Sequence, residues 1–307
     1  MPKRLIVTAD DFGLAVPVNE AVEAGHRNGI LTSASLMVTA AASADAVERA
    51  RRLPRLGVGL HLVLLDGRPA LPAEQIPELV GPDGRFSRDP IRLGARIFLS
   101  RRARSQAEAE IRAQLMAFRE TGLRLDHVDG HHHFHLHPTV QMILVRLAQE
   151  FGIAAIRVPH EPTAARRHRP AGQRIRDWLA ALPVRDRTPA MKRRLARAGI
   201  RFNDSILGLA DSGRLEPARI RELLAALPEG NTELYLHPAT RRWGDEDPLP
   251  ESYRPEAELA ALLDPSVRAA VEAAGAELAT FGELANMAHT PAAETAPAGT
   301  GLSGARS

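Results

Sequence analysis

Short apolar runs alternate with stretches of helical periodicity along most of the chain. Apolar runs at residues 5–7, 34–38 and 58–63 predict the first three strands. Between them, apolar residues at helical spacing predict helices over 17–28 and 45–53. This β-α-β-α-β opening is typical of a parallel sheet whose strands are joined by crossover helices.

The alternation continues through the rest of the chain. The spacing predicts a helix over 106–121 and another that begins near Pro138. Further strands are expected at 123–133, 154–158, 234–237 and 278–281. Six to eight such units favour the α/β class and a TIM-like (β/α) barrel, with an irregular or seven-stranded barrel as the alternative.

Two segments interrupt the alternation. Residues 163–201 are rich in arginine around short apolar pieces, which predicts a helical basic insertion. It is either a lid over the site or a solvated helical excursion. Residues 289–307 are rich in Ala, Pro, Thr, Gly and Ser, which predicts a disordered tail. We therefore expect one barrel domain over 1–288.

Composition narrows the class of protein. A hydrophobic content of 44% with 25% charged residues is typical of a globular core. The chain has no cysteine, which excludes disulfides and thiolate metal ligands. A net charge of +3 is too small to indicate nucleic acid as a partner. Neither a membrane-spanning run nor a secretory leader is recognisable, so we expect a cytoplasmic protein.

Histidine is concentrated in one short segment. Six of the twelve histidines lie within residues 127–137, in His-Val-Asp-Gly-His-His-His-Phe-His-Leu-His. If this segment is a strand, side chains alternate between its faces, so Asp129, His131 and His133 point into the barrel mouth and His132 points away. The alternative is that the histidines pack and hydrogen-bond with one another at a strand-to-helix turn.

Two adjacent acids, Asp10 and Asp11, end the first predicted strand. They repel each other unless a cation or a shared proton relieves them. With a metal present, Asp11 as a ligand stays ionised, and Asp10 is placed to take a proton from the bound water. Taken alone, Asp-Asp-Phe-Gly also fits a turn that leads into a helix.

Two isolated histidines, His61 and His237, also lie at predicted strand ends. Such a histidine is usually a core residue with a hydrogen-bond partner. The ends of parallel strands share one rim of a barrel, which changes the expectation here. Asp10, Asp11, His61, His131 and His237 are therefore expected to converge.

The chain resembles the YdjC-type carbohydrate deacetylases, which include chitooligosaccharide deacetylase. The resemblance covers nearly the whole domain. It is carried by Thr-Ala-Asp-Asp-Phe-Gly at 8–13, by the segments 28–33, 59–62 and 236–238, and by the histidine-rich segment. It implies a hydrolase of linear amide bonds that removes acetyl from an N-acetylated sugar.

The resemblance also implies roles for individual residues. Asp11, His61 and His131 would bind one divalent metal ion, Asp10 would be the base, and His237 would protonate the leaving amine. Two imidazoles and one carboxylate suit zinc better than magnesium, although magnesium or another divalent ion is also compatible.

A narrower resemblance is to the hopanoid-biosynthesis-associated subgroup of the family. It is carried by residues 134–140, 157–159 and 235–240. It implies an N-acetylglucosaminyl group on a hopanoid glycolipid as the substrate. Arg157 lies where the family often has an arginine near the site. The subgroup more often has Asn-Ala-His-Lys-His before Phe134, from which this chain departs.

Several alternatives remain open at this point. They are a free chito-oligosaccharide as the substrate, a phosphoester as the bond that is hydrolysed, and a non-catalytic metal- or carbohydrate-binding protein on the same fold. The basic segment 163–201 suggests peripheral contact with anionic headgroups at the inner membrane face. The sequence leaves the oligomeric state open, with a homodimer as one alternative.

Overall fold

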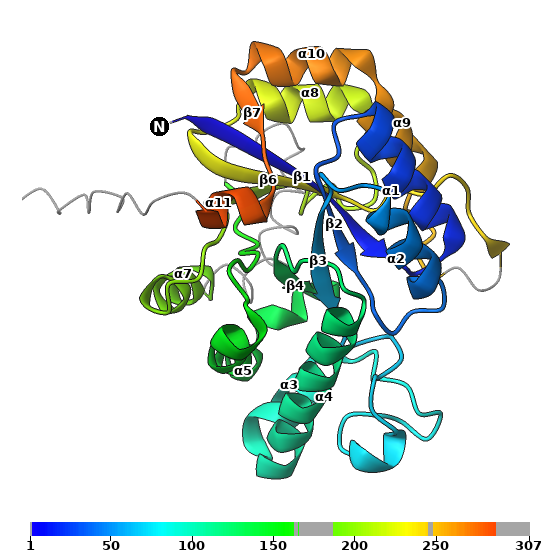
Figure 1. Cartoon of the computed structure of the whole chain (residues 1–307), viewed down its shortest axis with the longest axis vertical. Coiled ribbons are helices and arrows are strands. Elements are labelled where there is room, and N and C mark those ends of the chain that lie inside the picture. The colour runs from blue at the N-terminus through cyan, green and yellow to red at the C-terminus, as the bar shows by residue number, and fades with distance from the viewer. Residues whose placement is uncertain (1, 163–164, 166–186, 245–247, 287–307) are drawn as a thin grey trace, which may run out of the picture.

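A computed structural model describes residues 2–162, 165, 187–244 and 248–286. Its parallel sheet has the strand order β4-β3-β2-β1-β6-β5, with β7 also paired to β1 (Figure 1). The strands are β1 (Lys3–Phe12), β2 (Ser33–Leu36), β3 (Gly57–Leu62), β4 (Val128–Gly130), β5 (Ser205–Leu207), β6 (Gly230–Leu236) and β7 (Ala276–Leu278). The α/β class and the parallel sheet are therefore as expected.

Helices lie between the strands and cover the sheet (Figure 1). They are α1 (Val16–Asn28), α2 (Ser43–Arg51), α3 (Pro90–Leu99), α4 (Arg101–Glu120), α5 (Pro138–Phe151), α7 (Thr188–Arg197), α8 (Pro217–Ala225), α9 (Pro255–Leu263), α10 (Pro265–Ala273) and α11 (Phe281–Asn286), with 3-10 turns η1 (Ala73–Gln75) and η2 (His131–Leu136). Because helices cover the sheet, β2, β3 and the last eight residues of β1 are buried throughout.

The sheet curves into a barrel-like shape whose two ends are joined by short links. β4 reaches the next segment through a parallel bridge from Val128 to Ile156, and Ala155 bridges to Arg201. Residues 201–205 then lead directly into β5 at the other end of the sheet order. The strand expected at 154–158 is thus reduced to single bridges.

The strand expected over 123–133 is wrong at both ends, because β4 begins only at Val128. β4 stops at Gly130, and residues 131–136 form the 3-10 turn η2. His132 and His133 have φ values of +53°, a left-handed conformation far from the extended backbone of a regular strand. The alternation of side chains predicted for this segment therefore does not apply.

Other differences concern elements that the pattern did not reveal. α3, β5 and the helices α8 to α10 were not predicted, and Phe281 begins α11 instead of ending a strand. Most of the basic segment 163–201 and the whole tail 289–307 lie outside the described residues, and the described part of that basic segment includes α7. Among the described helices none is long and apolar enough to span a membrane.

Candidate metal and catalytic site

The site is built at the end of β1, where the strand becomes irregular. Its pairing with β2 shifts register between Ala9 and Phe12. Asp11 has a φ of +62°, which a residue with a side chain adopts only at some energetic cost. In a regular strand Asp10 and Asp11 would point to opposite faces. Here the distortion brings both carboxylates within reach of the same imidazole, that of His61.

Two imidazoles converge on one carboxylate oxygen of Asp11. His131 Nδ1 lies 3.1 Å from Asp11 Oδ1, and His61 Nε2 lies 3.4 Å from the same atom. Donor atoms of the three residues all lie within 4.8 Å of one another. Asp11 Oδ1 is buried and accepts no hydrogen bond of good geometry. A buried oxygen of this kind, facing two imidazole nitrogens, fits a divalent cation.

The electrostatics of the cluster agree with this geometry. Burial raises the pKa of Asp11, but the neighbouring His131 and His61 more than offset this and hold it well below its ordinary value. Burial lowers the pKa of His61, while the charges of Asp129 and Asp10 raise it well above normal. The cluster thus combines the ionised carboxylate of Asp11 with the imidazole of His61, which has several carboxylates around it.

The second nitrogen of His61 is fixed by Asp129. His61 Nδ1 lies 2.8 Å from Asp129 Oδ1, which leaves Nε2 directed at Asp11. Asp129 is fully buried and also accepts a 2.8 Å hydrogen bond from the hydroxyl of Ser35. A carboxylate behind a ligand histidine is the usual way in which proteins orient such a ring.

Arg157 is a fully buried side chain that contacts three carboxylates. Its Nη1 and Nη2 each donate a 2.7 Å hydrogen bond to Asp10, one to each oxygen. Nη1 also lies 2.6 Å from Asp129, and Nε and Nη2 bind Glu233 at 3.0 and 2.7 Å. Burial lowers the pKa of Arg157, but the three acids raise it well above normal. Arg157 therefore links the Asp10 side of the site to the Asp129 side.

His237 follows the last residue of β6. Its backbone N–H donates a 2.6 Å hydrogen bond to Glu258, a fully buried residue of α9. Its ring lies between those of Tyr235 and Tyr253, with centroids 5.4 and 5.1 Å away. Burial lowers the pKa of the His237 imidazole. Both tyrosines of the chain therefore flank this one histidine.

Among the described residues, His131 is the one histidine of the histidine-rich segment that joins the cluster around Asp11. His132 was expected to point away and is half exposed, 3.9 Å from Asp66. His133 is not part of the cluster and lies partly buried beside Tyr235, where desolvation holds its pKa well below normal.

The remaining histidines of that segment serve the fold. His127 bridges Ser35 and Asp126 at 3.1 and 3.0 Å. His135 donates to the backbone carbonyl of Arg157, and His137 stacks on Phe134. The packing alternative therefore describes part of this segment correctly.

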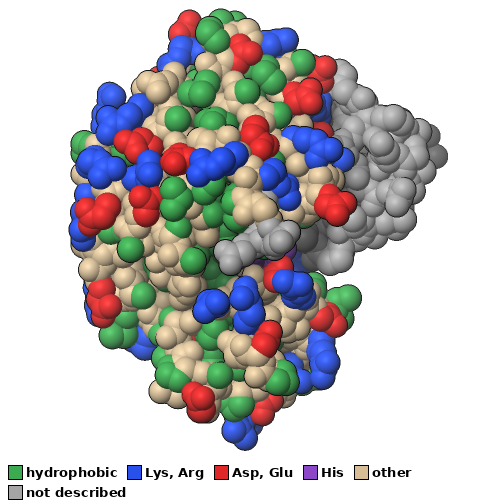
Figure 2. Space-filling view, turned by 90° about the vertical axis from the view of Figure 1, so that its right-hand side faces the viewer, with side chains coloured by type: hydrophobic (Ala, Val, Ile, Leu, Met, Phe, Trp, Pro, Cys, Tyr) green, Lys and Arg blue, Asp and Glu red, His purple; other side chains and the backbone are tan. Residues whose placement is uncertain are grey.

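Two site residues had no role in the sequence-based hypothesis. Glu233 was detectable, because it is an acid within the apolar run of β6. Glu258 carries no such signal, since it lies on a helix that was not predicted. Figure 2 shows a hollow across the middle of one face, where a histidine is visible. Acidic and basic side chains are mixed over the rest of that face.

A family model places this architecture among known proteins. The model of YdjC-like proteins matches residues 4–273. This chain belongs to the YdjC-like family. The match runs from β1 to the end of α10 and includes every site residue described above.

Two relatives of this YdjC-like protein are named carbohydrate deacetylase. The Geobacillus stearothermophilus protein is 32% identical over 92% of this chain and 99% of its own length. The Brevibacillus brevis protein is 41% identical over 49% of this chain and 57% of its own. A solved Enterococcus faecalis structure, provisionally described as a cellobiose-phosphate cleavage protein, covers 92% of this chain and 99% of its own at 24% identity with a TM-score of 0.70, which shows a shared fold.

Proposed function

We propose that this YdjC-like protein is a metal-dependent N-deacetylase that hydrolyses the acetamide of an N-acetylglucosaminyl group. The observation that carries the proposal is the convergence of His61 and His131 on Asp11 Oδ1, a buried oxygen without a hydrogen bond. The names of the curated relatives support the same class of reaction.

The metal would be held by Asp11, His61 and His131. Three protein ligands with further positions open are typical of catalytic zinc, so we propose zinc over magnesium. When bound, such an ion supplies a Lewis acid that polarises the acetamide carbonyl and lowers the pKa of a coordinated water. Asp129 holds His61 in the orientation that directs Nε2 toward Asp11, where the two residues would bind the ion together.

Asp10 is the proposed general base. It lies beside the cluster, with His61 and Asp129 among its neighbours, but it is bound by Arg157 through both oxygens. This grip fixes the plane of the carboxylate while each oxygen keeps a second lone pair. Asp10 therefore takes a proton from the attacking water without first having to reorient.

His237 is the proposed general acid. Burial lowers the pKa of its ring, so the protonated form gives up its proton readily. It would donate that proton to the nitrogen of the departing glucosamine as the C–N bond breaks, which yields acetate and a free amine. Tyr235 and Tyr253 restrict the ring on both sides.

For the acceptor we propose a lipid-linked sugar, an N-acetylglucosaminyl hopanoid. The support is the similarity of residues 134–140, 157–159 and 235–240 to the hopanoid-associated subgroup. A free chito-oligosaccharide is the competing acceptor, since the full-length relatives carry the broader name of carbohydrate deacetylase.

The test is acetate release from a matched panel of substrates. The same N-acetylglucosaminyl group is offered on a hopanoid lipid and on soluble chito-oligosaccharides, with enzyme that has been stripped by a chelator and then reloaded with zinc or magnesium. We expect metal-dependent release, fastest on the lipid-linked sugar. Release only from soluble oligosaccharides would correct the acceptor alone, and no release from any compound by metal-loaded protein would overturn the deacetylase proposal.

Assays of the same metal-loaded protein distinguish the deacetylase from two rival functions. A phosphoester hydrolase would release phosphate from phosphorylated sugars and no acetate from acetylated ones. A non-catalytic binding protein would bind metal and sugar with no turnover, and Asp10→Asn would then change neither property.

A further inference from the structure

Helix α3 exposes apolar side chains to an unusual degree. Ile91, Phe98 and Leu99 are 83%, 58% and 78% exposed. The described part of the chain has only eight large hydrophobic residues in this class, and three of them lie within the ten residues of α3. Single exposed hydrophobic residues are ordinary on protein surfaces, but a cluster on one helix indicates an interaction surface.

The three side chains share one side of the helix. Ile91 and Phe98 are two turns apart, and Leu99 is adjacent. The opposite side is buried through Leu93 and Ile97. α3 therefore has a second apolar side, beyond the one that packs on the protein core.

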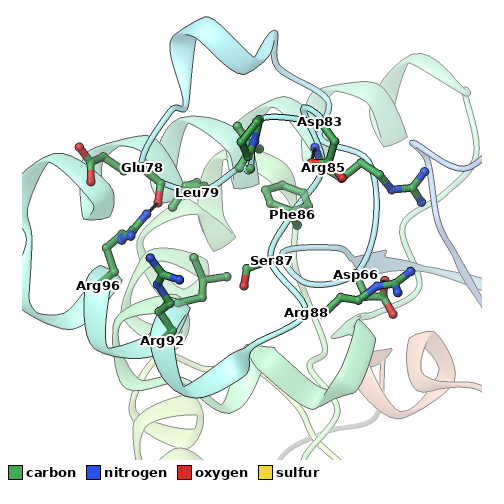
Figure 3. A pocket seen from close by; sticks show the side chains of 14 residues that line it. Asp66, Glu78, Leu79, Asp83, Arg85, Phe86, Ser87, Arg88, Arg92 and Arg96 are labelled. Atoms are coloured by element: carbon green, nitrogen blue, oxygen red, sulfur yellow. Dashed lines mark hydrogen bonds and ion pairs between the residues drawn. The ribbon is translucent and has the colours of Figure 1, made fainter.

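Arginines border this apolar side. Arg92 and Arg96 lie on α3, and they line a pocket of about 660 Å³ together with Arg85 and Arg88 (Figure 3). The buried Phe86 also contributes to its lining. In Figure 3, Arg92 and Arg96 stand on one side of this pocket and Arg85 and Arg88 on the other.

The acids of the pocket do not balance these charges. Arg88 donates to Asp66 at 2.7 Å, and Glu78 lies 3.8 Å from Arg102, a residue outside the pocket. Asp83, the remaining acid of the lining, accepts a hydrogen bond from the backbone N–H of Arg85, which leaves three arginines and one carboxylate in the rest of the pocket. Asp89, the acid that precedes α3, accepts hydrogen bonds from the first turn of the helix.

We propose that α3 and the arginine pocket beside it form a docking surface for an anionic phospholipid membrane. Ile91, Phe98 and Leu99 would enter the boundary between headgroups and acyl chains, and the arginines would contact lipid phosphates. An exposed apolar stripe bordered by arginines is the pattern by which interfacial helices bind such surfaces. A partner bound through charge alone, such as a nucleic acid, would leave the exposed apolar side chains of α3 without a contact.

The docking surface adjoins the candidate active site. Asp66 lines the arginine pocket and lies 3.9 Å from His132, the neighbour of His131. The ring of Phe98 lies 6.5 Å from that of His137. Docking would thus bring the mouth of the site close to the lipid surface. The docking itself is independent of the proposed function, while its use for a lipid-linked substrate rests on it.

The test is co-sedimentation of the full chain with vesicles of phosphatidylcholine, with and without phosphatidylglycerol, at low and high salt. The apolar variant is Ile91→Ser with Leu99→Ser, and the charge variant is Arg85→Gln with Arg92→Gln, two exposed arginines of the pocket. The matched control is Met116→Ser with Met142→Ser, which removes two exposed apolar side chains from α4 and α5. All four substituted residues of the test variants are exposed, so folding is expected to be retained.

We expect binding that requires phosphatidylglycerol and weakens with salt. The charge variant should bind roughly 25-fold more weakly, since each arginine contributes about fivefold. The apolar variant should lose at least about tenfold, and the methionine control should bind as wild type. Acetate release from a soluble substrate should stay unchanged in all variants, which separates a failure of docking from a failure of the proposed function.

Three results would overturn the proposal. The first is wild-type protein that does not bind phosphatidylglycerol vesicles, and the second is an apolar variant that binds them as well as wild type does. The third is an apolar variant that changes only the oligomeric state of the protein in solution, since α3 would then be an interface between two copies of the chain.

Discussion

Arg157 holds Asp10 through both carboxylate oxygens, with two hydrogen bonds of 2.7 Å. The planar guanidinium matches the geometry of a carboxylate, which a lysine ammonium cannot reproduce. Arg157 also contacts Asp129 and Glu233, so one cation orients the proposed base and the carboxylate behind His61 together. Its main contribution is therefore expected to be orientation.

Arg157→Lys tests this expectation, because it keeps the charge and removes the two-point grip. We expect kcat to fall by about 100-fold, as for a misplaced catalytic group, with metal content unchanged. Steady-state kinetics and metal analysis measure both. Arg112→Lys, in an exposed pair with Glu150, is the matched control. Unchanged kcat in Arg157→Lys would show that charge alone suffices.

Asp129→Asn is predicted to weaken metal binding without abolishing it. Asp129 orients His61, and loss of such a partner costs about 10- to 100-fold in metal affinity. A competition titration against a zinc chelator measures the change. Ser35→Ala, which removes one hydrogen bond to Asp129, should have a smaller effect in the same direction. Wild-type affinity in Asp129→Asn would argue against His61 as a metal ligand.

His237→Gln is predicted to slow the reaction according to the leaving group. If His237 protonates the departing amine, loss of the ring should cost about 100-fold or more on an N-acetylglucosaminide. The loss should be much smaller on an aryl acetamide, whose amine leaves without a full proton transfer. Comparing kcat on the two substrates measures this difference. Equal losses on both would assign His237 to binding instead of proton donation.

Glu258→Gln is predicted to change how stability depends on pH. Burial raises the pKa of Glu258 from 4.5 to about 7 in the folded protein, against the opposing hydrogen bonds from Leu215 and His237. The folded state therefore keeps this proton between pH 4.5 and 7 while the unfolded chain releases it, so stability falls as pH rises through that range.

The loss attributable to Glu258 is at most about 3 kcal/mol. Denaturant unfolding of wild type and Glu258→Gln across this range measures it. The advantage of wild type over the variant should shrink as pH rises from 4.5 to 7. A constant difference would mean that Glu258 is ionised in the folded state throughout.

Much of the site was predictable because parallel strands end at one rim. Asp11, His61 and His131 belong to strands, or follow strands, that are far apart in sequence, and the structure brings them within 4.8 Å. The bounds of the first two helices were also predicted closely, because their apolar residues recur at regular helical spacing. Periodicity describes regular elements well.

The parts that were missed depend on irregular backbone or on helices with weak patterns. The left-handed Asp11 and the turn after Gly130 break the alternation on which the strand prediction relied. α3 was not predicted although its ten residues are amphipathic, with Arg92 and Arg96 set against its apolar positions. Arg157 was expected near the site only by family resemblance, and its contacts with Asp129 and Glu233 are visible only in three dimensions.

The central claim is that two adjacent acids have separate tasks, Asp11 holding the metal and Asp10 moving the proton. The most direct test measures metal per chain and acetate release in Asp10→Asn and Asp11→Asn side by side. We predict that Asp10→Asn keeps about one metal ion and loses at least about 100-fold in turnover, whereas Asp11→Asn loses the metal. Turnover of Asp10→Asn within about threefold of wild type, or full metal occupancy in Asp11→Asn, would contradict the account.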